Sequence, residues 1–177
     1  MTVSERRTLP LALEVVFRTA EREDLPKLEW YGKYIHFRRM FQKTYEEQLL
    51  GQRLMLLAVV NDFPIGQVFI QLETFTDFFT DMRKRGYLYS LRVMDAFQRQ
   101  GIGSALIQEA ERILVAQRYD SISIAVAKDN LGARRLYERM GFRITSDDAG
   151  RWSYVDHEGR TQYVNEPSWI MEKSLRQ

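Results

Sequence analysis

Cysteine is absent from this chain of 177 residues, and histidine occurs only twice, as His36 and His157. Without a thiol the protein can have neither a disulfide framework nor a cysteine nucleophile, and a cysteine-ligated zinc site is excluded. Two histidines argue against a metal centre built on several imidazoles. We therefore expect no metal site and no thiol chemistry.

An excess of one charge and long apolar runs are lacking too. The 26 basic and 24 acidic residues are dispersed along the chain and leave a net charge of +2, so we expect no nucleic-acid partner and no polybasic membrane anchor. No segment approaches the roughly 20 apolar residues of a membrane helix. The apolar stretch 9–16 is interrupted by Pro10 and Glu14, unlike a secretory signal, and we expect a cytoplasmic protein.

The remaining composition is that of an ordinary globular domain. Apolar residues make up 45% and charged residues 28% of the chain. We find no internal repeat, no low-complexity stretch and no linker rich in proline, glycine or serine. The length fits a single domain over residues 1–177, in which residues 1–12 form a flexible or loosely packed extension.

The first half of the chain predicts a strand, a helical region and a hairpin. Residues 14–20 are β-branched and aromatic enough for a strand, and residues 24–52 are expected to be helical. Turn-forming residues at 61–64 separate the apolar runs 54–60 and 65–72, which predicts a hairpin, and a further strand is expected at 87–93. The helical region is rich in aromatic residues at spacings that fit one broad face, namely Trp30, Tyr31, Tyr34, Phe37, Phe41 and Tyr45.

A glycine-containing loop follows that last strand. Residues 98–104 read Gln-Arg-Gln-Gly-Ile-Gly-Ser and lead into a helix with apolar residues at 3.6-residue spacing. Glycines at 101 and 103 leave no side chain between a ligand and the unpaired N–H groups of the first helical turn, which favours a phosphate or pyrophosphate. Arg99 would add a charge-assisted contact. On these residues alone, a tight turn before an ordinary helix explains the two glycines equally well.

Two other nucleotide-binding loops do not fit these residues. A P-loop requires GxxxxGK[ST], which is absent from the chain. A dinucleotide-binding fingerprint requires a third small residue at the position of Leu106. Both are excluded.

A second strand-to-helix unit and a closing hairpin complete the predicted elements. Residues 121–126 alternate as a strand, Asn130 can cap the next helix, and Gly141 can end it. The helix carries an apolar stripe of Ala133, Leu136, Tyr137 and Met140. The tail from Trp152 to 175 is expected to form a β-hairpin whose strands complete the sheet.

Gln98-x-x-Gly101-x-Gly103 resembles the acyl-CoA pyrophosphate motif of the GNAT superfamily, and residues 130–142 (NLGARRLYERMGF) are similar to the segment that follows it there. The similarity covers roughly residues 54–145. It implies the GNAT fold, an α/β domain whose single mixed, mostly antiparallel sheet has a splayed central strand pair and is flanked by helices. It also implies acetyl-CoA as co-substrate.

The resemblance also implies which residues bind the cofactor. The backbone at the end of the strand 87–93 would pair with the pantetheine arm as an added strand, and the loop 98–104 would hold the pyrophosphate with its N–H groups. The Asn130 side chain would reach the pantetheine, although a simple helix cap is the competing interpretation. The full set is Leu91, Arg92, Val93, Gln98, Arg99, Gln100, Gly101, Ile102, Gly103, Ser104, Asn130, Ala133 and Tyr137.

For catalysis the resemblance implies that the Tyr137 phenol protonates the departing CoA thiolate, whereas its position on the apolar stripe is also that of a core aromatic. Several members of the superfamily place a glutamate on the strand that here spans 87–93, which carries no carboxylate. Glu73, at the end of the preceding strand, is our substitute for the base, with an exposed strand-end charge as the alternative. His36 is a weaker candidate, and Asp95 is expected to shape the loop.

We therefore expect an N-acetyltransferase that acts on a primary amine of a small molecule, peptide or protein, and a homodimer is possible. The acceptor pocket is expected from the first helical region, the loop 74–86 and the hairpin at 152–162. Its aromatic wall would consist of Trp30, Tyr31, Tyr34, Phe75, Phe78 and Phe79, with a role in the core as the competing interpretation of these residues. Three alternatives stay open. They are transfer of another acyl group or to an oxygen acceptor, a non-catalytic acyl-CoA sensor or regulatory module, and a purely structural domain.

Overall fold

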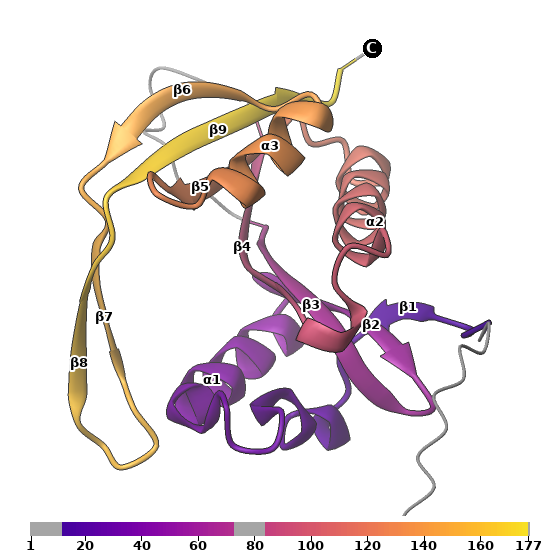
Figure 1. Cartoon of the computed structure of the whole chain (residues 1–177), viewed down its shortest axis with the longest axis vertical. Coiled ribbons are helices and arrows are strands. Elements are labelled where there is room, and N and C mark those ends of the chain that lie inside the picture. Colours follow the sequence, from indigo (N-terminus) through magenta and orange to yellow (C-terminus); the bar gives the residue numbers. More distant parts are fainter. Residues whose placement is uncertain (1–11, 73–83, 177) are drawn as a thin grey trace, which may run out of the picture.

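The computed structural model describes residues 12–72 and 84–176 (Figure 1). Four short 3-10 helices and three α-helices lie in the described part, namely η1 (Arg22–Asp24), η2 (Lys27–Glu29), η3 (Ile35–Phe37), α1 (Arg38–Leu49), η4 (Asp95–Phe97), α2 (Ile102–Ala116) and α3 (Leu131–Arg139). The described strands are β1 (Val16–Thr19), β2 (Arg53–Val60), β3 (Phe63–Gln71), β4 (Arg85–Val93), β5 (Ser121–Ala127), β6 (Arg143–Asp148), β7 (Arg151–Val155), β8 (Thr161–Asn165) and β9 (Ser168–Ser174).

The main sheet has seven strands in the order β1-β2-β3-β4-β5-β9-β6 and is antiparallel except between β4 and β5. The β4–β5 pairing begins at Arg85 and Ser121 and ends at Leu88 and Ile124, although both strands run on beyond it. The two strands therefore diverge at their carboxyl ends (Figure 1). The expected α/β fold, with a mostly antiparallel sheet and a splayed central pair, is confirmed.

The alternation of β2 explains how the helices cover the sheet. Leu56 and Ala58 belong to a core cluster with residues of α2, whereas Met55 and Leu57 belong to a second cluster with Phe41 of α1. Because successive strand residues point to opposite faces, α1 and α2 lie on opposite faces of the sheet. The loop before α2 and the aromatic region before α1 thus approach the splay from its two sides.

The region 24–52 differs from the continuous helical region that we expected. Only Arg38–Leu49 forms an α-helix, and residues 22–37 form short 3-10 turns. Trp30 and Tyr31 have φ values of 43° and 58°, and Gly32 has 91°. This left-handed run cannot continue a right-handed helix, and periodicity alone gave no sign of it.

The tail departs from its prediction as well. β7 and β8 form the expected hairpin, but they make a separate two-stranded ribbon (Figure 1). β9 inserts between β5 and β6 and completes the main sheet. Asp156 fixes the ribbon's turn, since its Oδ1 accepts hydrogen bonds from the backbone N–H groups of Glu158 (3.0 Å) and Arg160 (2.9 Å).

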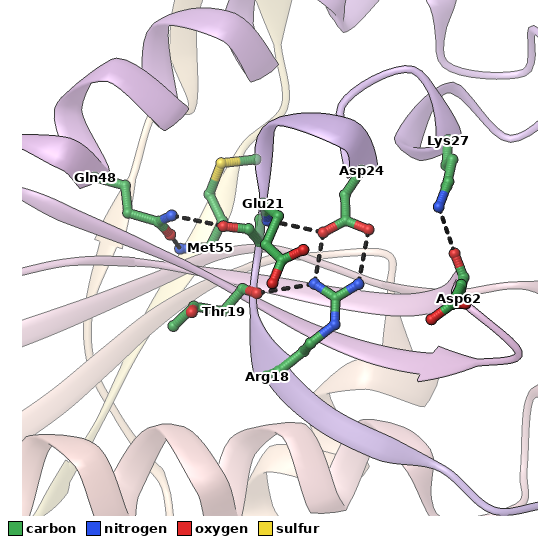
Figure 2. A network of polar contacts seen from close by, with 9 residues as sticks. Arg18, Thr19, Glu21, Asp24, Lys27, Gln48, Met55 and Asp62 are labelled. Atoms are coloured by element: carbon green, nitrogen blue, oxygen red, sulfur yellow. Dashed lines mark hydrogen bonds and ion pairs between the residues drawn. The ribbon is translucent and has the colours of Figure 1, made fainter.

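A polar network joins β1 to η1 beneath the sheet's edge (Figure 2). Arg18 donates to both carboxylate oxygens of Asp24, at 2.6 and 2.9 Å, and the Glu21 N–H donates to the same carboxylate at 2.8 Å. Burial alone raises the pKa of Asp24, but these hydrogen bonds outweigh it and hold that pKa below its usual value. The network fixes the turn that leads the chain into the aromatic region.

Candidate active site

The loop between β4 and α2 is held by its first residue. The Gln98 side-chain amide donates to the Val93 carbonyl at 3.0 Å and to the Asp95 carboxylate at 3.1 Å. Arg99 and Gly101 both take positive φ values, 59° and 85°. Gln98 therefore folds the loop back onto the end of β4, and the two left-handed residues turn the chain into the helix.

The amino terminus of α2 presents free backbone donors. The first intrahelical hydrogen bond runs from the Ala105 N–H to the Gly101 carbonyl, at 2.9 Å, and no side chain caps the helix. The N–H groups of Ile102, Gly103 and Ser104 precede it, and with the helix dipole they favour an anion. A Cβ at Gly103 would meet Leu136 and Val93 only at ordinary contact distances of 3.8 and 3.9 Å. Protein packing alone does not demand glycine there.

Gly101 is a glycine for another reason. No atom lies within 4 Å of a Cβ built on it, so space is not the constraint. Its φ of 85° disfavours any other residue. Both interpretations of the motif are thus present in one loop, since Gly101 shapes the turn and Gly103 leaves the donors uncovered. The loop fits the pyrophosphate of a CoA thioester.

The carboxyl end of β4 offers an unpaired edge beside this loop. The register between β3 and β4 shifts between Gln67 and Phe69, so that β4 bulges, and Ser90 in the bulge has a φ of 54°. Leu91, Arg92 and Val93 follow the bulge and have no partner in β5. An extended ligand arm can pair with this edge as an added strand.

The start of α3 lies across the splay from that edge. The Asn130 Oδ1 accepts a hydrogen bond from the Ala133 N–H at 3.1 Å, so the capping interpretation is confirmed. Its side-chain amide nitrogen is not used in the cap and can still donate to a ligand. Ala133 is half-buried against the main core.

Tyr137 lies one turn farther along α3 and is only 5% exposed. Its ring contacts that of Phe142, with 6.0 Å between centroids. Burial, with a smaller effect from nearby Tyr87, raises the pKa of Tyr137 to about 12. The phenol therefore stays protonated at neutral pH, as a proton donor must, and its surroundings are also those of a core aromatic.

A cavity of about 590 Å³ opens between the splayed strands and the β7–β8 ribbon. It contains three cationic side chains from β2, β4 and β7, two tyrosines from β4 and two carboxylates near the ribbon. These are Arg53, Arg92, Arg151, Tyr87, Tyr89, Asp148 and Glu166. Another hollow, of about 500 Å³, lies on the ribbon itself and shares only Arg151 and Trp152 with this cavity. The first cavity has the chemistry of an acceptor pocket.

The structure brings only some predicted acceptor residues to this pocket. Trp152 lines it, and Tyr34 lies under Arg92, which also lines it. Trp30 is instead a core residue whose indole donates to the Pro64 carbonyl at 2.9 Å, and Tyr31 stacks on Phe63 with 87% of its surface exposed. For Trp30 the alternative of a core aromatic is therefore confirmed, and Tyr31 is not part of the cavity wall. The predicted base Glu73 and the aromatic residues Phe75, Phe78 and Phe79 lie outside the described residues.

His36 joins the aromatic cluster before α1 to the ribbon. Its ring lies 4.2 Å from Phe37 and 6.1 Å from Tyr154, and Phe37 and Tyr154 are themselves 4.9 Å apart. Burial and the charge of Arg92 lower the pKa of His36. The histidine packs between η3 and the ribbon and does not line the cavity.

The Arg92 side chain was missed as a functional group, because the motif pointed only to its backbone. Its guanidinium carbon lies 4.7 Å from the Tyr34 ring centroid and 4.8 Å from that of Phe37. The Nη1 atom is buried and has no hydrogen-bond partner among the described residues. Burial lowers the pKa of Arg92, and no carboxylate in the described ranges offsets this effect.

Two searches for other kinds of site found nothing within residues 12–72 and 84–176. No three histidine, aspartate or glutamate side chains come together as a metal-binding group there. No helix in this part of the chain is long and apolar enough to span a membrane.

Comparisons with known proteins agree with this geometry. The sequence model of the acetyltransferase (GNAT) family matches residues 17–142. N-alpha-acetyltransferase 30 of Xenopus laevis is 31% identical over 90 residues, which cover 51% of this chain and 32% of that protein. The human protein of the same name is also 31% identical over 90 residues, and the matched segment is 24% of that protein's length. The chain thus spans about a third or less of these relatives.

Solved structures show the same fold. Arabidopsis thaliana NAA60, in complex with acetyl-CoA, superposes with a TM-score of 0.70 at 22% identity over 91% of this chain and 98% of that chain. The ribosomal-protein-S18-alanine N-acetyltransferase of Escherichia coli superposes with a TM-score of 0.67 at 20% identity, over 93% and 96% of the two chains.

Proposed function

The chain belongs to the acetyltransferase (GNAT) family, and from this premise we propose that it transfers the acetyl group of acetyl-CoA directly to a primary amine within a ternary complex. The observation that carries the proposal is one juxtaposition. The edge of β4 beyond Leu88, unpaired on the β5 side, leads through η4 and the loop 98–101 into the uncapped amino terminus of α2. A strand-like arm and a pyrophosphate would thus be bound by consecutive segments.

We assign cofactor binding to three segments. The backbone of Leu91, Arg92 and Val93 would pair with the pantetheine arm, and Asn130 and Ala133 would face it from α3. The loop of Gln98, Arg99, Gln100, Gly101, Ile102, Gly103 and Ser104 would hold the pyrophosphate. The superposed structure of Arabidopsis thaliana NAA60 contains acetyl-CoA, which supports this assignment.

Acetyl-CoA supplies an activated thioester, which an amine attacks without a covalent enzyme intermediate. Holding the two partners in line contributes several kcal/mol to such a step. As the new C–N bond forms and the C–S bond breaks, the Tyr137 phenol would donate its proton to the departing sulfur. The raised pKa of Tyr137 keeps that proton in place until it is needed.

The amine must lose a proton before it attacks, because a lysine-like amine is mostly ammonium at neutral pH. Glu73 is our proposed base. Asp148 and Glu166, which line the cavity, are the carboxylates against which it should be tested. The three variants Glu73→Gln, Asp148→Asn and Glu166→Gln separate them. Loss of the base should remove the acidic limb of the pH profile of kcat/KM, whereas loss of a wall residue should change only its height.

The acceptor is an amine of a peptide, a protein or a small molecule. N-alpha-acetyltransferases among the relatives favour an α-amine, so peptides with free amino termini belong in the first substrate panel. A cytoplasmic location and a homodimer remain predictions from the sequence.

Release of CoA tests the proposal directly. Because the chain has no cysteine, a thiol reagent in the assay reports only released CoA, without a protein background. We expect CoA release that depends on the amine, with one acetyl group found on the amine per CoA by mass spectrometry. Acetyl-CoA binding without release for any amine would favour the sensor instead. Release of CoA only from an acyl-CoA other than acetyl-CoA would show that the enzyme transfers a different acyl group.

A further inference from the structure

Three arginines line the cavity, namely Arg53, Arg92 and Arg151, and Arg92 differs from the other two. Arg151 is exposed to solvent, which can satisfy its guanidinium. Arg53 forms an ion pair with Glu47 at 2.7 Å, and Arg38 pairs with Glu29. Arg92 is half-buried and its Nη1 atom is fully buried, yet the described residues give it no carboxylate and no hydrogen bond to Nη1. A buried guanidinium with an unused donor is costly unless a partner completes it.

The surroundings hold this guanidinium ready for a ligand. The rings of Tyr34 and Phe37 lie within 5 Å of its carbon, at 4.7 and 4.8 Å, and fix it by cation–π contact. Phe37 in turn packs against Tyr154 of the ribbon, with 4.9 Å between centroids. The side chain therefore does not have to be ordered when an anion arrives, which favours tight recognition.

The position of Arg92 limits what the anion can be. Arg92 lines the acceptor cavity, while its backbone lies on the β4 edge assigned to the pantetheine arm. If the pantetheine arm pairs with that edge as proposed, the guanidinium would lie about one side-chain length from the thioester. An anion that it binds must lie on the acceptor itself, close to the amine that is acetylated.

We propose that Arg92 binds a carboxylate of the acceptor, so that the preferred substrate is an amine bearing a carboxylate near its amino group. This inference rests on the proposed acetyl transfer. The planar guanidinium matches a carboxylate through two parallel N–H donors, which a lysine cannot reproduce. The carboxylate would belong to a free amino acid or to an acidic residue at the amino terminus of a peptide.

The other charges in the cavity are consistent with this assignment. Asp148 and Glu166 line it from β6 and from the connection before β9, and neither forms an ion pair with Arg92. They supply a negative side that suits the acceptor's ammonium group. Of the three arginines in the wall, Arg53 is paired with Glu47 and Arg151 is exposed on β7, so Arg92 supplies the unpaired, half-buried positive charge. The cavity is thus polarised to match an amine with a neighbouring carboxylate.

Matched acceptors test the inference. One arm compares free amino acids with their carboxamides, and the other compares peptides that begin with Asp or Glu with peptides that begin with Asn or Gln. We expect kcat/KM to favour the acid by at least about tenfold in one arm, and that arm identifies the source of the carboxylate. Arg92→Met should bring the ratio to about one, and Arg92→Lys should leave an intermediate ratio. Dividing the wild-type ratio by the Arg92→Met ratio cancels the different basicities of acid and amide amines.

Two controls keep the outcome clear. Arg53→Met removes a cation of the same cavity that Glu47 already neutralises, and Arg112→Met removes an exposed one on α2 that pairs with Glu109. Both should keep the acid preference. Equal ratios in wild type and Arg92→Met, or loss of preference in Arg112→Met as well, would overturn the inference.

A failure of acetyl transfer is distinguishable from a failure of this inference. If no amine is acetylated, the proposed function fails, and calorimetric titration of the CoA-loaded protein with the same acid and amide pairs still decides the role of Arg92. Tighter binding of the acid that disappears in Arg92→Lys and Arg92→Met supports the inference. Equal affinities for acid and amide contradict it.

Discussion

Replacing Tyr137 by phenylalanine separates its two interpretations. The side chain is 5% exposed, its ring packs against Phe142, and its hydroxyl has no hydrogen-bond partner in the described part of the chain. Tyr137→Phe keeps the ring and removes only a hydroxyl that forms no hydrogen bond there. We therefore expect the free energy of unfolding to change by less than about 1 kcal/mol.

The catalytic effect should be far larger than the effect on stability. Loss of a positioned general acid lowers the rate of the chemical step by about 10²–10⁴-fold. The affinity for acetyl-CoA should change little, because the phenol acts on a sulfur that becomes charged only as the C–S bond breaks. Single-turnover CoA release measures the chemical step, and calorimetric titration measures the affinity.

The control is Tyr31→Phe, which removes a hydroxyl from a residue that is 87% exposed and lies outside the cavity. It should leave both the rate and the affinity unchanged. If Tyr137→Phe keeps its single-turnover rate within about twofold of wild type, Tyr137 is a core aromatic only. A loss in the free energy of unfolding as large as the rise in the activation free energy would also contradict the assignment.

Three further predictions concern the turn after β1, the pyrophosphate loop and alkaline pH. Asp24→Ala removes the partner of Arg18 and should lower the free energy of unfolding by about 2–3 kcal/mol in chemical denaturation. An unchanged denaturation midpoint would show that the network of Figure 2 adds nothing to stability. Gly101→Ala forces a left-handed φ of 85° on a residue with a Cβ, so it should cost about 1 kcal/mol of stability and weaken acetyl-CoA binding in calorimetry. An unchanged affinity would contradict the proposal that this loop binds the pyrophosphate. Because the pKa of Tyr137 is raised from 10 to about 12, the folded state keeps a proton that the unfolded state loses above pH 10. Wild type should therefore lose about 1.4 kcal/mol more stability than Tyr137→Phe between pH 9 and pH 11. Equal losses would contradict the raised pKa.

The loop could be predicted because its signals are local, whereas the splay was expected only from the resemblance to the GNAT superfamily. The spacing of Gln98, Gly101 and Gly103, followed by a regular helix, depends only on neighbouring residues. The strand before it, at 87–93, matches β4 (Arg85–Val93) to within two residues. The cap at Asn130 is equally local, since the side chain bonds to an N–H three residues away.

The acceptor side could not be predicted in the same way, because it depends on contacts between distant segments. The cation–π contacts of Arg92 join β4 to Tyr34 and Phe37, more than 50 positions away in the numbering. Asp148 reaches the cavity only because β6 lies at the far side of β9, an order that strand patterns do not reveal. The aromatic spacing at 30–45 suggested one helical face, but the left-handed run at Trp30 and Tyr31 interrupts the helix, so these residues do not share one face.

The most direct test of the central claim is the free energy of unfolding measured with and without acetyl-CoA. At a concentration 100 times its dissociation constant, a ligand that binds only the folded state adds about 2.7 kcal/mol. We expect this gain for wild type, and a smaller one for Gly101→Ala at the same concentration. No gain with saturating acetyl-CoA or any other acyl-CoA would contradict the proposal that β4 and the loop 98–104 form a cofactor site.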